Sequence, residues 1–169
     1  MPPTSQPAPR RAPPALYTPA ERARRDATRW TLVQGVLAPV QFLVFAISLV
    51  LVLRTLATGQ GEAAASISVG IKTALLYTIM VTGAIWEKRV FGVYLFARSF
   101  FWEDVFSMLV LALHTAYLWA WWGRHLGTHE LMLLALAAYA AYVINATQFV
   151  LKLRAARLQA AAAPMGAAA

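Results

Sequence analysis

Four long runs of apolar residues dominate the chain, and short polar segments separate them. The runs cover approximately residues 31–53, 64–86, 100–122 and 130–151. At about 1.5 Å per residue, each run is long enough as an α-helix to cross a hydrocarbon layer about 30 Å thick. The pattern predicts an all-α fold, an integral membrane four-helix bundle. Neighbouring helices should be antiparallel because their connections are short, at about 54–63, 87–99 and 123–129.

The two ends of the chain differ in composition from the four runs. Residues 1–15 hold six of the nine prolines and few apolar side chains, which predicts a disordered arm over about 1–16. Residues 159–169 are rich in Ala and are expected to form a frayed tail. Thr18, Pro19 and Glu21 have the spacing of a capping box with proline in the first turn. They predict a short basic surface helix running toward Trp30, at the start of a membrane domain over 17–158.

Composition and charge support the membrane assignment and orient the bundle. Hydrophobic residues make up 60% of the 169 residues, charged residues make up 13%, and the mean hydropathy is +0.57. No cysteine is present, which excludes disulfides and thiolate metal sites. The net charge of +8 forms no basic stripe on a soluble fold, so we expect no nucleic-acid partner. Twelve Lys and Arg residues flank one side of the predicted helices and two flank the other, which predicts cytoplasmic termini.

Several polar residues interrupt the apolar runs, where an ionisable group is expensive and usually faces a bundle interior. Glu103 and His114 are eleven residues apart, so they share one helix face about 16 Å apart along the axis. Lys72, on the preceding run, is expected at the depth of His114. Most other polar positions fall in the same leaflet as Glu103: Gln34, Gln41, Glu87, Asp104, Asn145 and Gln148.

Each of these residues also has a structural interpretation. Glu103 and Asp104 are also suited to the start of a helix, where the helix dipole stabilises carboxylates. Glu87 can belong to a solvated cluster with its basic neighbours. Lys72 can extend to the interface, and His114 can be a hydrogen-bonded packing residue, a metal ligand or a proton shuttle. Asn145 and Gln148 are more often contacts between helices. Motifs of zinc proteases, dinucleotide-binding proteins, P-loop enzymes and serine hydrolases are absent from the sequence.

Seven segments resemble the bacteriochlorophyllide 3-vinyl hydratases of phototrophic bacteria. The longest is FWEDVFSMLVLALHTAY at 101–117, and the others lie in order at 26–28, 30–35, 37–42, 76–83, 85–88 and 142–146. The resemblance spans about 16–158. It implies addition of water to the 3-vinyl group of chlorophyllide a or a bacteriochlorin relative, giving a 3-(1-hydroxyethyl) product in bacteriochlorophyll synthesis. A non-catalytic pigment carrier or assembly factor is the alternative. A small proton-coupled transporter, with Lys72, Glu103 and His114 as a relay, is a third class, which the lack of an internal repeat disfavours.

This chemistry needs an acid and a held water. Protonation of the terminal vinyl carbon leaves a cation that the macrocycle delocalises, and water then adds to it. Desolvation among aromatic side chains keeps a carboxyl protonated near neutral pH. We therefore predict Glu103 as the general acid, with Asp104 or Glu87 orienting and deprotonating the water.

The remaining expectations concern binding. His114 is a candidate axial ligand for the substrate's own magnesium or a residue that holds the pocket, and Lys72 and Asn145 are expected near the same pocket. Trp86, Trp102, Tyr77 and Phe106 are candidates for stacking on the macrocycle, and Lys88, Arg89 or Arg98 for pairing with its propionate. The protein should need no cofactor and no metal of its own. We expect it in the bacterial inner or intracytoplasmic membrane, as a homo-oligomer or in contact with other enzymes of the pathway.

Overall fold

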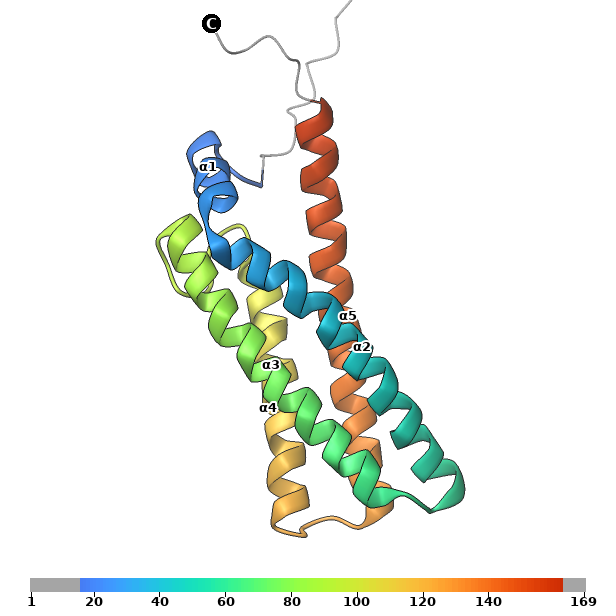
Figure 1. Cartoon of the computed structure of the whole chain (residues 1–169). Coiled ribbons are helices and arrows are strands. Elements are labelled where there is room, and N and C mark those ends of the chain that lie inside the picture. Colours follow the sequence, from blue (N-terminus) through green and yellow to red (C-terminus); the bar gives the residue numbers. More distant parts are fainter. Residues whose placement is uncertain (1–15, 163–169) are drawn as a thin grey trace, which may run out of the picture.

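The computed structural model describes residues 16–162, which form five helices (Figure 1). They are α1 Pro19–Ala27, α2 Arg29–Thr58, α3 Glu62–Phe91, α4 Phe101–Trp122 and α5 Thr128–Ala162. The expected arm at 1–16 lies outside the described residues except for Leu16. The expected tail at 159–169 lies outside them beyond residue 162.

Helices α2 to α5 are each long and apolar enough to cross a membrane, so the prediction of four apolar helices is confirmed. Three of them are longer than their apolar runs, since α2 and α3 have 30 residues each and α5 has 35, whereas α4 with 22 residues matches its run. The apolar run marks the part suited to lipid, while the helix continues through flanking residues that also favour helix. Pro39 lies inside α2 and lacks a backbone N–H. Membrane helices tolerate proline because neighbouring helices and side chains can satisfy the backbone carbonyl that loses its partner.

Helix α1 begins with the capping box that the sequence predicts. Thr18 Oγ1 accepts a hydrogen bond from the Glu21 backbone N–H at 3.2 Å, and Glu21 Oε2 accepts one from the Thr18 N–H at 2.7 Å. Thr28 ends α1 and is also the N-cap of α2. Arg24 Nε donates to the Val90 carbonyl at 2.8 Å and so joins α1 to the end of α3.

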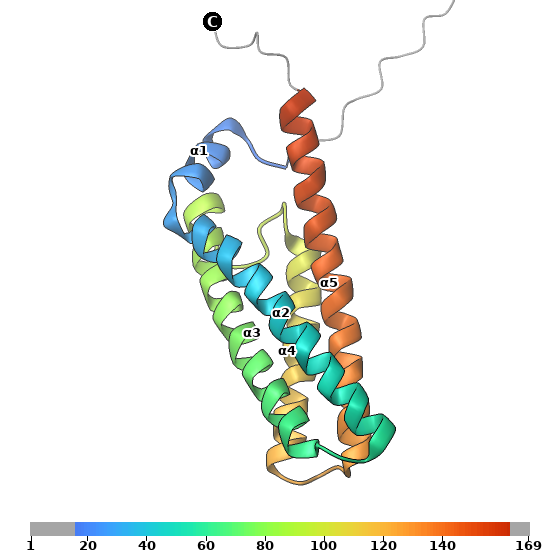
Figure 2. The same cartoon turned by 45° about the vertical axis from the view of Figure 1, so that its right-hand side comes forward.

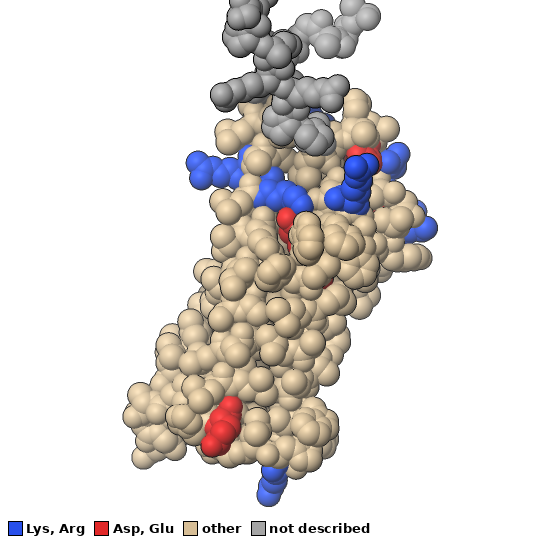
Figure 3. All heavy atoms as spheres, turned by 180° about the vertical axis from the view of Figure 1, so that it is seen from behind, with Lys and Arg blue, Asp and Glu red and all other residues tan. Residues whose placement is uncertain are grey.

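The bundle consists of two closely packed pairs, α2 with α3 and α4 with α5 (Figures 1 and 2). One end of it carries α1, the α3–α4 connection and the C-terminal part of α5, and we call this the terminal end. Gly59 and Gly61 turn the chain between α2 and α3 at the opposite end, with φ of 69° and 85°. Lys and Arg gather at the terminal end, and the middle of the face seen in Figure 3 carries few charges.

The interior of the bundle holds many polar side chains beside its apolar core. Tyr139 Oη lies 2.5 Å from Ser48 Oγ, and Tyr117 Oη donates to Ser66 Oγ at 3.0 Å. Many Leu, Val and Ile side chains face outward instead. This distribution suits a lipid environment, in which polar groups must find partners inside the protein. The buried polar and charged residues are Gln41, Ser48, Thr55, Ser66, Lys72, Thr73, Glu87, Glu103, Asp104, Ser107, His114 and Asn145.

Candidate functional site

Two buried carboxyl groups meet at the terminal end of the bundle. Glu87, in the last turn of α3, and Asp104, in the first turn of α4, lie within hydrogen-bonding reach of each other. Their residues are 5% and 4% exposed. Two backbone amides of the α3–α4 connection hold them: Ala97 N–H donates to Glu87 Oε2 at 3.1 Å and Phe96 N–H to Asp104 Oδ2 at 2.7 Å.

This carboxyl pair is suited to holding one proton. Two ionised carboxylates in contact repel each other, and burial removes the water that would screen them. The two amides stabilise the negative charge that remains when the pair holds a single proton. A shared proton can leave the pair and return to it.

Phe96 shows that the connection is shaped around the pair. Its φ is 60°, in the left-handed region that a bulky residue rarely adopts. In this conformation its N–H reaches Asp104 while its side chain stays 43% exposed. The backbone strain is therefore located where the carboxyl pair is held.

Glu103 has a different partner from its neighbour Asp104. Lys152 Nζ lies 2.5 Å from Glu103 Oε2 and also donates to the Ser99 carbonyl. This ion pair joins α4 to α5 and to the connection before α4. Glu103 is therefore engaged by Lys152, and the two backbone amides contact Glu87 and Asp104 instead.

Exposed aromatic side chains lie on the α3–α4 connection and at the start of α4, close in sequence to Asp104. Phe96 and Phe101 have ring centroids 5.8 Å apart, and Phe101 and Trp102 have centroids 5.5 Å apart. Phe101 and Trp102 are 44% and 66% exposed. We call these three residues the aromatic platform. Arg98 is also exposed on the same connection, and Lys88 Nζ lies 5.2 Å from the ring centroid of nearby Tyr94.

Two of the four predicted stacking residues are less open than this platform. Trp86 is half-buried, donates from Nε1 to Thr31 Oγ1 at 2.9 Å and packs edge-on against Phe91 and Phe100. Phe106 is half-buried on α4. Tyr77 is exposed farther down α3, where its hydroxyl lies 2.6 Å from Thr115 Oγ1.

A second polar centre lies in the middle of the bundle, with one residue from each long helix. Lys72 Nζ donates to Gln41 Oε1 at 2.5 Å and lies 3.7 Å from the ring centroid of Tyr142. His114 Nδ1 lies 2.8 Å from the Val110 carbonyl, which places its proton on Nδ1. Lys72 and His114 are both fully buried. Gln41 Nε2 and His114 Nε2 have no hydrogen-bond partner among the described residues.

The predicted residues therefore separate into two groups along the bundle. Asn145 lies between them and donates to Ser107 Oγ at 2.8 Å. Asp104 and His114 are ten residues apart on one helix, which corresponds to about 15 Å along its axis. Within residues 16–162, no three His, Asp or Glu side chains gather as metal ligands would.

The sequence interpretation missed the roles of Lys152 and Phe96. Lys152 follows Asn145 and Gln148 at helical spacing on one face of α5, a pattern that is readable from sequence. Its charge alone predicts only a basic residue that flanks the fourth helix. No sequence pattern marks Phe96, because its role depends on its backbone N–H and on a backbone conformation that its residue type disfavours.

Comparison with known proteins identifies the family. The sequence profile of the 2-vinyl bacteriochlorophyllide hydratase family (BCHF) matches residues 17–155. A protein of Cereibacter sphaeroides with that name is 70% identical over 164 residues, covering 96% of this chain and 99% of the relative. The chain belongs to this family. A Rhodobacter capsulatus protein of the same name is 68% identical over 152 residues, covering 90% and 88% of the two chains.

The match to the vinyl hydratase family confirms the resemblance seen in the sequence. It spans α1 to α4 and most of α5, and it therefore includes both polar centres and the aromatic platform. No solved structure matches the chain.

Proposed function

We propose that this chain adds water to the vinyl group of a bacteriochlorophyllide or chlorophyllide, as the names of its relatives describe. The vinyl substituent numbered 2 in those names is the one numbered 3 in the sequence analysis, under the newer numbering of the macrocycle. The observation that carries the chemistry is the burial of the Glu87 and Asp104 carboxyl groups beside each other, each with a backbone amide of the α3–α4 connection donating to it. The reaction is that of a hydro-lyase.

The carboxyl pair supplies the proton and recovers one. Its shared proton moves to the terminal vinyl carbon, and the positive charge forms on the carbon attached to the macrocycle, where the ring delocalises it. A water oxygen then bonds to that carbon and loses one proton to the carboxylate pair. The product is the 1-hydroxyethyl group, and the pair returns to its starting protonation state without a further base.

Glu103 acts as a positioning residue in this proposal. The sequence made it the first candidate for the acid because of its helix face. Its ion pair with Lys152 instead supports a role in fixing the start of α4, and thereby Asp104, against α5.

The aromatic platform is where we place the macrocycle. Flat rings stack on exposed aromatic faces, and Phe96 joins the platform to the carboxyl pair through its own N–H. A ring lying here would direct its vinyl group toward Asp104. Arg98 and Lys88, on the same side of the bundle, are suited to the propionate, which would remain at headgroup level.

We propose no cofactor, since the substrate carries its own magnesium. The unpartnered Nε2 of His114 is chemically able to ligate that magnesium. However, about 15 Å of helix separates Asp104 from His114, which exceeds half the width of the macrocycle. A ring centred on His114 would leave its vinyl group out of reach of the carboxyl pair, so we assign His114 and Lys72 to the support of the bundle interior.

The orientation follows from the charges of the two ends. Lys and Arg gather at the terminal end, which we place on the cytoplasmic side of the bacterial inner membrane. Helix α1, with its basic last turn, would lie on that surface. The carboxyl pair would then be at the depth of the headgroup boundary, where water is available.

The function is tested by incubating membranes that contain the protein with chlorophyllide a. We expect a product heavier by one water, with absorption moved to shorter wavelength because the vinyl conjugation is lost. Return of the pigment bound but unchanged would favour the carrier alternative and refute the proposal. Membranes with the Asp104→Asn variant are the matched control.

A further inference from the structure

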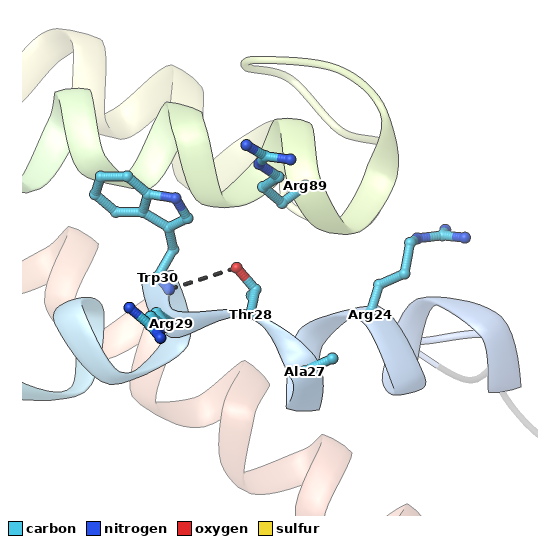
Figure 4. Close-up of a pocket in the computed structure, with 6 residues that line it drawn as sticks. All are labelled: Arg24, Ala27, Thr28, Arg29, Trp30 and Arg89. Atoms are coloured by element: carbon cyan, nitrogen blue, oxygen red, sulfur yellow. Dashed lines mark hydrogen bonds between the residues drawn. The ribbon is translucent and has the colours of Figure 1, made fainter.

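An open pocket of about 400 Å³ lies where α1, α2 and the end of α3 meet, on the terminal end of the bundle (Figure 4). Its polar lining is strongly basic. The residues that line it are Arg24, Ala27, Thr28, Arg29, Trp30 and Arg89. None of them is acidic, and nearby Asp26 is paired with Arg25 at 2.7 Å.

The three arginines bring positive charge from three helices to one pocket. Arg24 uses its Nε on the Val90 carbonyl, which leaves its terminal nitrogens as donors. Within the described part of the chain, the side chains of Arg29 and Arg89 form no hydrogen bond or ion pair. The lining holds three arginines and no acidic side chain, so a bound oxyanion would supply the missing counter-charge.

We propose that this pocket binds the phosphate group of an anionic phospholipid. Guanidinium groups match phosphate oxygens in geometry and charge. A pocket of about 400 Å³ is larger than a lone ion needs and accommodates a lipid headgroup. Trp30 extends from the start of α2 toward α3 at the edge of the apolar bundle (Figure 4), the depth at which tryptophan meets headgroups.

The substrate's propionate carries a similar charge, but it is the weaker candidate. Glu87 and Arg89 are two residues apart on α3 and therefore about 200° apart around the helix. A macrocycle whose vinyl group reached Glu87 would have to pass around α3 to place its propionate in the pocket. The lipid site is thus separate from the aromatic platform.

The test uses the full chain, purified in mild detergent and analysed by native mass spectrometry with added phosphatidylglycerol or phosphatidylcholine. The pocket variant is Arg29→Gln with Arg89→Gln, and the matched control is Arg154→Gln with Arg157→Gln, two exposed arginines on the terminal part of α5. Circular dichroism and thermal unfolding verify that both variants fold. A third variant, Arg29→Lys with Arg89→Lys, keeps the charge in case the Gln variant unfolds.

We expect the wild type and the control to bind phosphatidylglycerol at least tenfold more tightly than phosphatidylcholine, and the pocket variant to lose this preference. The Lys variant should bind more weakly than the wild type, because ammonium groups lack the planar fork. Equal losses in the pocket and control variants would overturn the proposal, since net charge alone would then explain binding. Retention of inorganic phosphate by lipid-free protein, lost in the pocket variant, would instead assign the pocket to a soluble anion and overturn the lipid.

Discussion

Three single substitutions distinguish the carboxyl pair from its neighbour Glu103. Glu87→Gln and Asp104→Asn keep a carbonyl oxygen that can accept the N–H of Ala97 or Phe96, and each removes one acid of the pair. Glu103→Gln keeps the shape of Glu103 and removes the charge that meets Lys152. All three changes are nearly isosteric, so differences among them report on protons and charge.

The expected magnitudes follow from these contacts. Loss of a general acid lowers the rate by about 10²- to 10⁴-fold, or about 3–5 kcal/mol of transition-state stabilisation, and we expect this for Glu87→Gln and Asp104→Asn. Glu103→Gln removes a charged hydrogen bond from a partly exposed pair, which should cost about 1–2 kcal/mol of stability after allowance for solvent screening. Its kcat per folded molecule should remain within about threefold of the wild type.

The assay measures initial rates of vinyl hydration with the pigment in detergent micelles, normalised to folded protein. Binding is measured separately by quenching of tryptophan fluorescence by the pigment. The reasoning predicts normal pigment binding and lost turnover for Glu87→Gln and Asp104→Asn. Full activity in either variant would refute the assignment of the acid role to the carboxyl pair. A 100-fold loss of activity in folded Glu103→Gln would return the acid role to Glu103.

Three other predictions concern the platform and the buried centre. Replacing Phe96 or Trp102 by Leu should raise KM about 2- to 10-fold with a smaller change in kcat, because one stacking contact is lost. The control is Trp122→Leu, since Trp122 is 88% exposed at the opposite end, and it should leave KM unchanged. Equal effects on KM at both ends would indicate that these aromatic residues only anchor the protein in the membrane. His114→Ala should leave the visible spectrum of the bound pigment the same as in the wild type. If the substitution removed an absorption shift that ligation of the magnesium causes in the wild type, His114 would be the axial ligand. Gln41→Leu should destabilise the protein by about 3 kcal/mol, since Lys72 loses its hydrogen-bond acceptor. Adding Lys72→Met to this variant should recover much of the lost stability in thermal unfolding. Additive losses of stability in the double variant would contradict the coupling between Gln41 and Lys72.

Much of the fold could be predicted because a membrane imposes simple rules on sequence. Apolar runs mark the four long helices, and Thr18 with Glu21 marks the start of α1. Helices α2, α3 and α5 extend beyond their runs, because helix formation continues where suitability for lipid stops. Pro39 would have suggested a break in a soluble protein, yet α2 passes through it.

The candidate site was harder to predict, since it depends on how side chains select partners across helices. Glu103 and Asp104 are adjacent in sequence, but helical geometry turns them toward different neighbours, α5 and the α3–α4 connection. Spacing placed Glu103 and His114 on one helix face. It could not show that the two residues belong to separate groups of polar side chains at different depths of the bundle. The aromatic platform depends on Phe96, whose backbone conformation no propensity would favour.

The distribution of polar groups also accounts for how one small bundle can hold an acid beside an oily substrate. A carboxyl group in lipid is costly unless protein donors surround it, and the α3–α4 connection supplies two amides directly to the pair. Those amides are free because the connection is neither helix nor strand, and its ends are fixed by the Glu103–Lys152 ion pair and by the Arg24–Val90 contact. The connection can therefore satisfy the charge from one side and leave the other side to the aromatic platform. Shortening this connection should disable catalysis before it disrupts the four helices, because the ten-residue core cluster that joins them lies farther down the bundle.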